Sequence, residues 1–430
     1  METTMGMSLV LIVLVVYCSS ATLVTCSAAA GFRVELTHVD AKRGYTAAER
    51  VQRAMASSRQ RLASFAADVA APVHWNTSQY IAEYLIGTPP QRAEALIDTG
   101  SDLIWTQCTT CLQKRGSCVK QGLPLYNASK SNTFHPVSCN DTLCLANQEH
   151  TCAKDGSCNF GAFYGAGDAT GSIGTEVFTF QNGSETLTFG CVNDLAITEG
   201  SLDGSSGLIG LGRGPLSLVS QTRATKFSYC HTPYLRSNAT TGASSHLFVG
   251  DSASLSGSSP VMSMSFVESP KEYPFYYVPL VGITVGNTRL SIPPTVFALN
   301  KSGDGGVIVD SGSPTTALVD GAYDPLTEEL KRQLNGSLIP PPAGSGVDLC
   351  VALVQEKTVP SMVFHFSGGA DMVLPRENYW APLDNSTSCM VMDHSGGFSI
   401  IGNFQLQNKH MLYDLAKNQL SFQTVDCSSL

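Results

Sequence analysis

Two short segments of the chain place an aspartate at the same point of nearly the same pattern. Residues 95–101 read Ala-Leu-Ile-Asp-Thr-Gly-Ser, and residues 307–313 read Val-Ile-Val-Asp-Ser-Gly-Ser. In each segment an apolar run typical of a buried strand ends at a tight glycine turn. We therefore expect Asp98 and Asp310 to lie where buried strands open into loops, beside hydroxyl donors. Two carboxyl groups brought together can share a proton and do acid–base chemistry.

Each aspartate is followed at a similar distance by a second pattern, two apolar residues and a glycine. Leu208-Ile209-Gly210 ends 112 residues after Asp98, and Ile400-Ile401-Gly402 ends 92 residues after Asp310. The same order in both halves indicates an internal duplication. Two copies at so long a period predict paired lobes and not a solenoid, which needs more repeats. The length of 430 residues also suits two lobes better than one core.

An Asp-Thr/Ser-Gly-Ser loop occurring twice, each followed by an apolar-apolar-Gly element, resembles the pepsin-type aspartic proteases. The sequence around the loops is similar to that of the plant nepenthesin-like branch, which has a prosegment and a cysteine-rich insertion. The resemblance extends from about Gly31 to Cys427. It implies a mostly β, bilobal fold with the active-site cleft between two β lobes. It also implies an aspartic endopeptidase that works best at acidic pH and needs no cofactor or metal.

The resemblance assigns roles to the residues of both loops. Asp98 and Asp310 would form the catalytic dyad, in which the ionised carboxylate activates a water and the protonated one donates to the substrate carbonyl. The neighbouring residues would orient the carboxylates, brace the loops against each other and let backbone amides approach; they are Thr99, Gly100, Ser101, Ser311, Gly312 and Ser313.

A glycine-rich tip between two short β runs, near residues 160–180, predicts a hairpin. In the family that the chain resembles, such a hairpin is the flap over the cleft. Tyr164 and Gly165 match its tip, and the flap tyrosine of that family hydrogen-bonds a tryptophan that matches Trp105. At this tip, Ala166 and Asp168 differ from the residues that are most common in the family.

Other classes of protein fit the sequence less well. The nine histidines contain no His-x-x-x-His pair near acidic ligands, as a metal-dependent hydrolase would require. The chain also lacks the Gly-x-Ser-x-Gly motif of a serine nucleophile. A binding protein on the same fold is the competing hypothesis, because some plant relatives of these proteases act as inhibitors of microbial glycanases. The two complete Asp loops, the flap tyrosine and the prosegment favour the enzyme.

The chain divides into four expected parts: a signal peptide at 1–30, a prosegment at 31–75, an N-terminal lobe with the cysteine-rich insertion and flap at 76–255, and a C-terminal lobe at 256–430. An apolar run from Leu9 to Tyr17 followed by small residues predicts the signal peptide, with a membrane anchor as the alternative. The polar stretch Ser252–Ser259 is the expected linker between the lobes. In the second lobe, apolar residues at helical spacing predict a helix near Ala322–Leu334.

The expected prosegment is basic and partly helical. Residues 31–70 hold seven Lys/Arg and four Asp/Glu, so the net charge of the rest of the chain is more negative than the −9 of the whole chain. Ala47–Ala66 predicts a helix in which Val51, Met55, Leu62 and Phe65 are apolar and arginines lie between them. We expect this segment to lie over an acidic cleft, to block it near neutral pH and to leave it in acid.

Cysteines and glycosylation motifs predict an oxidising compartment. Twelve of the 14 cysteines follow the expected signal peptide, which indicates disulfides more than a zinc site. The resemblance would pair Cys111–Cys118 and Cys144–Cys152. Eight Asn-x-Ser/Thr motifs predict glycosylation; they begin at Asn76, Asn127, Asn140, Asn182, Asn238, Asn300, Asn335 and Asn385. We expect a monomer that is secreted, with the vacuole as an alternative destination. It should act on polypeptides, bind no nucleic acid and carry no membrane anchor.

Overall fold

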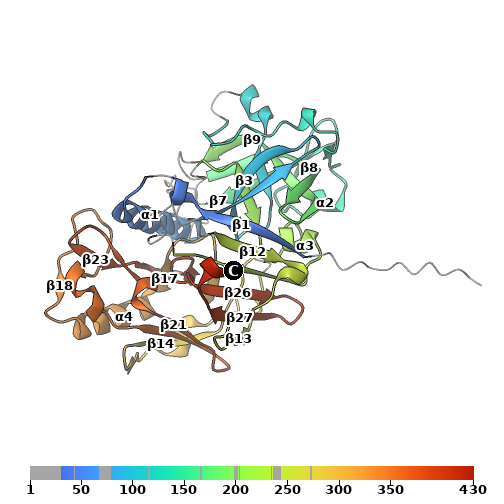
Figure 1. The fold of residues 1–430 in the computed structure, drawn as a ribbon. Coiled ribbons are helices and arrows are strands. Elements are labelled where there is room, and N and C mark those ends of the chain that lie inside the picture. Colours follow the sequence, from blue (N-terminus) through green and yellow to red (C-terminus); the bar gives the residue numbers. More distant parts are fainter. Residues whose placement is uncertain are drawn as a thin grey trace, which may run out of the picture.

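A computed structural model of the protein consists mostly of β-strands arranged as two lobes around a shared central sheet (Figure 1). It describes residues 31–42, 44–66, 79–114, 117–164, 167–197, 202, 204–233, 235, 244–271 and 274–430. The mostly β, bilobal fold that the resemblance implied is confirmed. The expected signal peptide and the expected boundary near residue 75 lie outside the described residues.

One large sheet runs from the first lobe through the middle of the molecule. Its strands lie in the order β13-β27-β26-β11-β12-β1-β2-β3-β10-β4-β9-β8-β7-β6, with β5 paired to β8. Their bounds are β1 Phe32–His38, β2 Tyr80–Ile86, β3 Gln91–Asp98, β4 Trp105–Gln107, β5 His135–Pro136, β6 Thr151–Cys152, β7 Cys158–Tyr164, β8 Gly167–Phe180, β9 Gly183–Ile197, β10 Gly207–Gly210, β11 Lys226–Cys230, β12 Ser245–Val249, β13 Met262–Ser265, β26 Lys409–Asp414 and β27 Gln419–Thr424.

The centre of this sheet joins distant parts of the chain. β1, from the expected prosegment, pairs antiparallel with both β12 and β2, and β26 near the C-terminus pairs with β11. Aromatic rings form the core beneath these strands: Phe227 and Tyr413 stack with their centroids 4.4 Å apart, and the hydroxyls of Tyr229 and Tyr413 are 2.9 Å apart. The sequence did not predict β1 as a strand, and the structure makes it a central one.

The second lobe contains three smaller sheets of four strands each among the described residues. Their orders are β15-β14-β20-β21, β16-β25-β17-β24 and β18-β19-β23-β22. Their bounds are β14 Leu280–Val285, β15 Thr288–Arg289, β16 Val307–Asp310, β17 Thr316–Val319, β18 Leu338–Ile339, β19 Cys350–Ala352, β20 Met362–Phe366, β21 Asp371–Leu374, β22 Trp380–Pro382, β23 Thr387–Met390, β24 Met392–Ser395 and β25 Ser399–Gly402.

Both predicted helices are present. The four α-helices of the described residues are α1 Ala47–Ala66, α2 Thr142–Leu145, α3 Leu218–Gln221 and α4 Asp320–Gln333. α1 begins at a capping box, in which Glu49 accepts a 2.7 Å hydrogen bond from the Thr46 N–H and Thr46 Oγ1 accepts one from the Glu49 N–H. Val51 and Met55 are buried, and α1 lies between the two lobes (Figure 1).

Six disulfides join the twelve cysteines between Cys108 and Cys427: Cys108–Cys191, Cys111–Cys118, Cys139–Cys152, Cys144–Cys158, Cys230–Cys427 and Cys350–Cys389. The expected Cys111–Cys118 pair is confirmed. The expected Cys144–Cys152 pair is wrong, because Cys152 on β6 lies against Cys139 while Cys144 on α2 faces Cys158 on β7. Spacing along the chain left these partners undecided, and the β6–β7 hairpin decides them.

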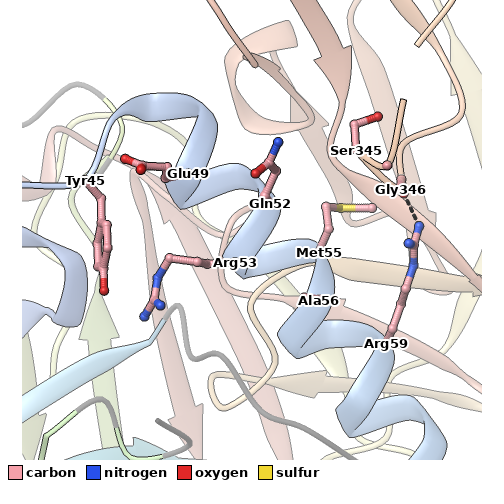
Figure 2. A pocket seen from close by; sticks show the side chains of 10 residues that line it. Tyr45, Glu49, Gln52, Arg53, Met55, Ala56, Arg59, Ser345 and Gly346 are labelled. Carbon is pink, nitrogen blue, oxygen red and sulfur yellow. Dashed lines mark hydrogen bonds between the residues drawn. The ribbon is translucent and has the colours of Figure 1, made fainter. Parts of the chain in front are cut away.

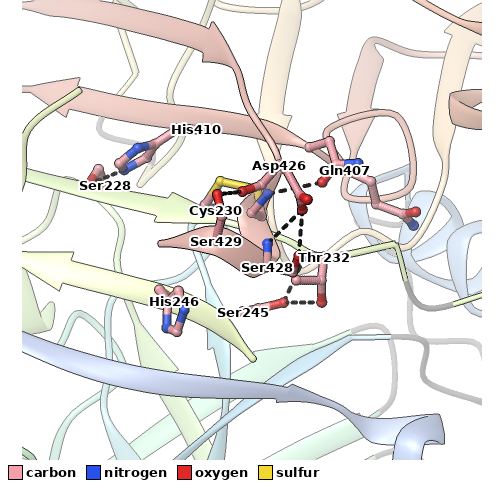
Figure 3. The surroundings of a disulfide bond; sticks show 12 residues. Ser228, Cys230, Thr232, Ser245, His246, Gln407, His410, Asp426, Ser428 and Ser429 are labelled. Atoms are coloured by element: carbon pink, nitrogen blue, oxygen red, sulfur yellow. Dashed lines mark hydrogen bonds between the residues drawn. A yellow bond between two sulfur atoms is a disulfide. The ribbon is translucent and has the colours of Figure 1, made fainter. Parts of the chain in front are cut away.

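Cys230–Cys427 closes the longest disulfide loop, with a sequence separation of 197 residues. It ties the end of β11 to the C-terminus beside β26, among a group of polar side chains (Figure 3). Thr232 and Ser245 share a 2.9 Å hydroxyl contact there, and Asp426 accepts a hydrogen bond from the Ser428 N–H. The C-terminal segment is therefore fixed to the central sheet.

None of the helices within the described ranges combines the length and the apolar composition needed to cross a bilayer.

The two disulfides with very different loop lengths allow a test of this architecture. Replacing Cys230 and Cys427 by Ala together is expected to destabilise the fold more than the double replacement Cys111→Ala/Cys118→Ala, which opens a separation of only 7 residues. The chain-entropy model gives a difference of about 3 kcal/mol between the two losses. Denaturant unfolding of both variants beside the wild type measures it. Equal losses would contradict a constraint that acts through loop length.

Candidate active site

The two Asp loops meet at the centre of the molecule. β3 runs parallel to β10, with Asp98 opposite Gly210, and β16 runs parallel to β25, with Asp310 opposite Gly402. The two downstream apolar-apolar-Gly elements predicted from the sequence are therefore the strands that flank the two aspartates. This arrangement repeats in both halves, as the internal duplication predicted.

Hydrogen bonds between the loops hold them together. The Thr99 N–H donates to Ser311 Oγ at 3.1 Å, and the Ser311 N–H donates to Thr99 Oγ1 at 2.9 Å. Each hydroxyl also donates across to the other half, Thr99 Oγ1 to the Val309 carbonyl and Ser311 Oγ to the Ile97 carbonyl, both at 3.3 Å. All four bonds are buried, so each loop fixes the position of the other.

Each carboxylate has the same set of donors. Ser101 Oγ donates to Asp98 Oδ2 at 2.6 Å, and Ser313 Oγ donates to Asp310 Oδ2 at 2.7 Å. The N–H groups of the following glycines donate to the other oxygens at 2.9 Å. Gly312 must lack a side chain, because a Cβ there would collide with Asp98 Oδ1. These bonds fix the orientation of both carboxylates.

Burial makes the charge state of this site sensitive to its neighbours. Asp98 is 1% exposed and Asp310 is fully buried. Burial raises the pKa of Asp310; the Arg61 guanidinium opposes this shift, and the Asp98 charge adds to it. Two like charges at this depth are costly, which favours one shared proton or a neighbouring cation.

The predicted hairpin is formed by β7 and β8, and its tyrosine reaches the cleft. Trp105 Nε1 donates a 2.7 Å hydrogen bond to the Tyr164 hydroxyl, so these two residues have the contact that the resemblance implied. Burial raises the pKa of Tyr164, and the Trp105 hydrogen bond opposes this shift. Gly165 and Ala166 at the tip lie outside the described residues.

An arginine that the sequence analysis did not single out lies between the two aspartates. Arg61, near the end of α1, donates from Nη2 to Asp98 Oδ1 at 2.5 Å and from Nε to Asp310 Oδ2 at 2.6 Å. Its side chain is 5% exposed. Burial alone would lower the pKa of Arg61, but the Asp310 and Asp98 carboxylates raise it overall. A single guanidinium therefore forms ion pairs with both loops at once.

Other residues from the N-terminal part of the chain also contact the second lobe near the site. The Thr315 N–H donates to Ser58 Oγ at 2.7 Å, and the Gln79 side-chain amide donates to the Gly312 carbonyl. Arg59 pairs with the Asp393 carboxylate. The arginines within the predicted helix were the signal that could have found Arg61 and Arg59, but which acids they reach depends on the docked position of α1.

A cavity of about 460 Å³ remains between α1 and the loop at 344–346. Figure 2 shows Met55 and Arg59 projecting from α1 toward this loop. Across the described residues no group of three or more His, Cys, Asp or Glu side chains could hold a metal ion. The contacts of Arg61 show a carboxyl pair covered by a segment of the same chain.

The comparisons with known proteins agree with this geometry. Family models described as xylanase inhibitor N-terminal and xylanase inhibitor C-terminal match residues 80–251 and 275–424. The chain is 39% identical to aspartic proteinase nepenthesin-1 of Nepenthes gracilis over 93% of this chain and 91% of that protein. It is 34% identical to nepenthesin-2 of the same plant over the same shares. It is also 34% identical to aspartyl protease family protein 2 of Arabidopsis thaliana, over 85% of this chain and 74% of that protein.

Solved structures share the fold at low sequence identity. The crystal structure of edgp matches with a TM-score of 0.69 at 16% identity, covering 93% of this chain and 96% of that one. Basic 7S globulin from soybean matches with a TM-score of 0.64 at 17% identity, covering 81% and 94%.

Asp102, beside the first loop, gives a prediction on pH. It accepts a 2.7 Å hydrogen bond from the Gly214 N–H, and burial raises its pKa to about 6. An unfolded aspartate has a pKa of about 3.9, so the folded state binds the proton more tightly and loses stability as the pH rises from 4 to 6. The shift corresponds to about 3 kcal/mol. Asp102→Asn, which keeps an acceptor, is expected to remove this loss.

Unfolding free energies of the wild type and Asp102→Asn at pH 4 and pH 7 test this expectation. The gain of the variant over the wild type should be larger at pH 7. Asp251→Asn, at an exposed position, is the matched control for the loss of one carboxylate. A pH dependence that is the same in wild type and Asp102→Asn would contradict the prediction.

Proposed function

The chain belongs to the plant nepenthesin-like branch of the pepsin-type aspartic proteases, and from this premise we propose that it is a secreted zymogen whose Asp98–Asp310 dyad hydrolyses peptide bonds in acid. Members of this family are aspartic-type endopeptidases that act on peptides. The observation that carries the proposal is the pair of buried carboxylates on braced, duplicated loops, with Arg61 between them.

The proposed chemistry uses one proton on two carboxyl groups. With Arg61 gone, two neighbouring carboxylates in a buried site would not both ionise, so one keeps a proton, as in aspartic proteases generally. The ionised group takes a proton from a water as the water attacks the substrate carbonyl, and the protonated group donates to the carbonyl oxygen. The proton of the attacking water later goes to the leaving amine.

The proposed roles of the supporting residues follow from their contacts. Ser101 and Ser313 orient the carboxylates, Thr99 and Ser311 keep the two loops at a fixed separation, and the Gly100 and Gly312 amides donate to the dyad. Fixed donors of this kind lower the barrier because they need no rearrangement during the reaction. Tyr164, oriented by Trp105 and adjoined by Gly165, would close over a bound peptide.

The proposed zymogen has two separate attachments. β1 is a strand of the central sheet, paired on both sides, and α1 fills the cleft with Arg61 on the dyad. Acid protonates carboxyl groups, which removes their charge from the Arg61 ion pairs and favours release of α1. The raised pKa of Asp310 places its protonation at a less acidic pH than that of an ordinary aspartate.

The division of the chain is part of the same proposal: signal peptide at 1–30, prosegment at 31–75, N-terminal lobe at 76–255 and C-terminal lobe at 256–430. Six disulfides suit an oxidising compartment, so we propose secretion of a glycosylated monomer. A binding role is the second candidate, because the matching family models carry the description xylanase inhibitor. The complete dyad favours hydrolysis, and the next experiment separates the two.

Removing either carboxylate is expected to abolish most of the activity. Asp98→Asn and Asp310→Asn, each nearly the same size as the aspartate it replaces, should lower kcat/KM by at least roughly 10²–10⁴-fold, because the dyad then lacks its base or its shared proton. The measurement is cleavage of a denatured protein by acid-treated enzyme from pH 2 to 7, with and without a transition-state inhibitor of aspartic proteases. A folded wild type that cleaves nothing would favour the binding role.

Removing Arg61 is expected to make activation easier. Arg61→Gln takes one partner out of a buried ion pair, so docking of α1 should weaken by about 3–5 kcal/mol. The precursor should therefore convert and become active at a higher pH than the wild type. Arg53→Gln is the matched control, because it removes the same charge from the same helix but breaks a pair with Asp40, away from the dyad.

Conversion is followed by the size of the chain and by peptide cleavage across a pH series. An Arg61→Gln precursor that converts at the same pH as the wild type and as Arg53→Gln would show that the ion pair does not hold the cleft closed.

A further inference from the structure

A second arginine of α1 has a binding site of its own on the C-terminal lobe. The Arg59 guanidinium donates from Nε to the Asp393 carboxylate and from Nη2 to the Gly346 carbonyl. Gly346 has a φ of +69°, and a Cβ there would collide with the guanidinium. The backbone of this loop therefore lies directly against the guanidinium, where the Gly346 carbonyl accepts a charge-assisted hydrogen bond.

The Asp393 carboxylate is held in a position where it can pair with a cation. Its side chain is only 3% exposed, whereas that of Arg59 is 44% exposed, so the carboxylate forms the base of the site and the arginine enters from the solvent side. One oxygen accepts a 3.0 Å hydrogen bond from the His394 N–H, and the other accepts from Arg59. α1 covers Asp393 on β24 in this structure, so once α1 leaves, the carboxylate faces the opened cleft and can accept hydrogen bonds from a new cation.

The surroundings add room and further negative charge. The cavity of about 460 Å³ adjoins Arg59 and is bounded by Ser345 and Gly346 on the lobe side (Figure 2). Ser345 Oγ is buried and has no hydrogen-bond partner within the described part of the chain. Tyr323, which is close enough to Asp393 and Arg59 to feel both charges, donates a 2.6 Å hydrogen bond to Asp348.

We propose that Asp393 and the Gly346 carbonyl form a substrate subsite for a basic side chain, which Arg59 occupies in the precursor. The inference rests on the proposed function of the dyad and adds the chemistry of one substrate residue. Asp393 on β24 lies opposite Ala317 of β17, in the same sheet as the Asp310 strand β16. Ser58, the neighbour of Arg59, accepts a hydrogen bond from Thr315 just before β17, so the subsite belongs to the second-lobe side of the cleft, near the scissile bond. Arginine should bind better than lysine, because its planar fork reaches both acceptors at once.

The test compares peptides that differ only in one residue. A peptide series carries Arg, Lys or the neutral Gln in turn at each of the positions around one scissile bond, and the readout is the Arg/Gln ratio of kcat/KM. For activated wild type at pH 6, one position should show a ratio well above one, with Lys in between. In Asp393→Asn the ratio at that position should fall by at least about tenfold.

Three further arms make the result specific. Asp371→Asn, on the separate sheet that contains β21, is the matched loss of charge and should keep the wild-type ratio. Asp393→Arg should reverse the preference toward Glu at the same position. The ionisable groups that face Asp393 are Arg59 of α1, the adjacent His394 and Tyr323 of α4. Because protonation removes the charge of the Asp393 carboxylate, the wild-type ratio should also decrease as the pH falls. This last arm needs no variant to fold.

The two levels of the proposal can fail separately. No cleavage of any peptide by wild type would overturn the function of the dyad. Efficient cleavage of the Gln peptides with no position that prefers Arg, or an Arg preference that survives in Asp393→Asn and is unchanged by pH, would overturn the subsite alone.

Discussion

Two carboxyl groups that are buried in neighbouring loops cannot both carry a negative charge unless a cation or a proton compensates them. Arg61 supplies this cation in the structure, because it contacts both Asp98 and Asp310. In the proposed enzyme a single proton replaces the arginine. The same constraint explains why a basic segment suits the cleft, and why, in the proposed zymogen, acid would both release this segment and suit the proposed chemistry.

The hydrogen bonds between the two Asp loops hold the carboxylates of Asp98 and Asp310 close together. Neither half could position its aspartate alone, because Thr99 bonds to the second loop and Ser311 bonds to the first. The duplicated strands β3 and β16 supply the apolar support, and the central sheet with Cys230–Cys427 joins the two lobes around them.

The segment that fills the cleft also maps it. Arg61 lies where the reacting water and carbonyl would lie, Ser58 and Gln79 bond to backbone groups of the second loop, and Arg59 bonds to Asp393 and Gly346. A docked segment and a substrate compete for the same acceptors, so the contacts of one indicate what the other can offer. This logic underlies the subsite that we assign to Asp393.

The sequence by itself determined the features that depend on neighbouring residues. The strands around Asp98 and Asp310, the helix at Ala47–Ala66 and the duplicated pattern follow from local apolar periodicity and turn chemistry, and the structure contains each of them. The partners of Arg61, which lie 37 and 249 positions away, were decided only by the tertiary structure. So were the pairs Cys139–Cys152 and Cys144–Cys158, and the central place of β1. Pairing across such distances depends on how packed elements are oriented, and residue patterns along the chain do not encode that orientation directly.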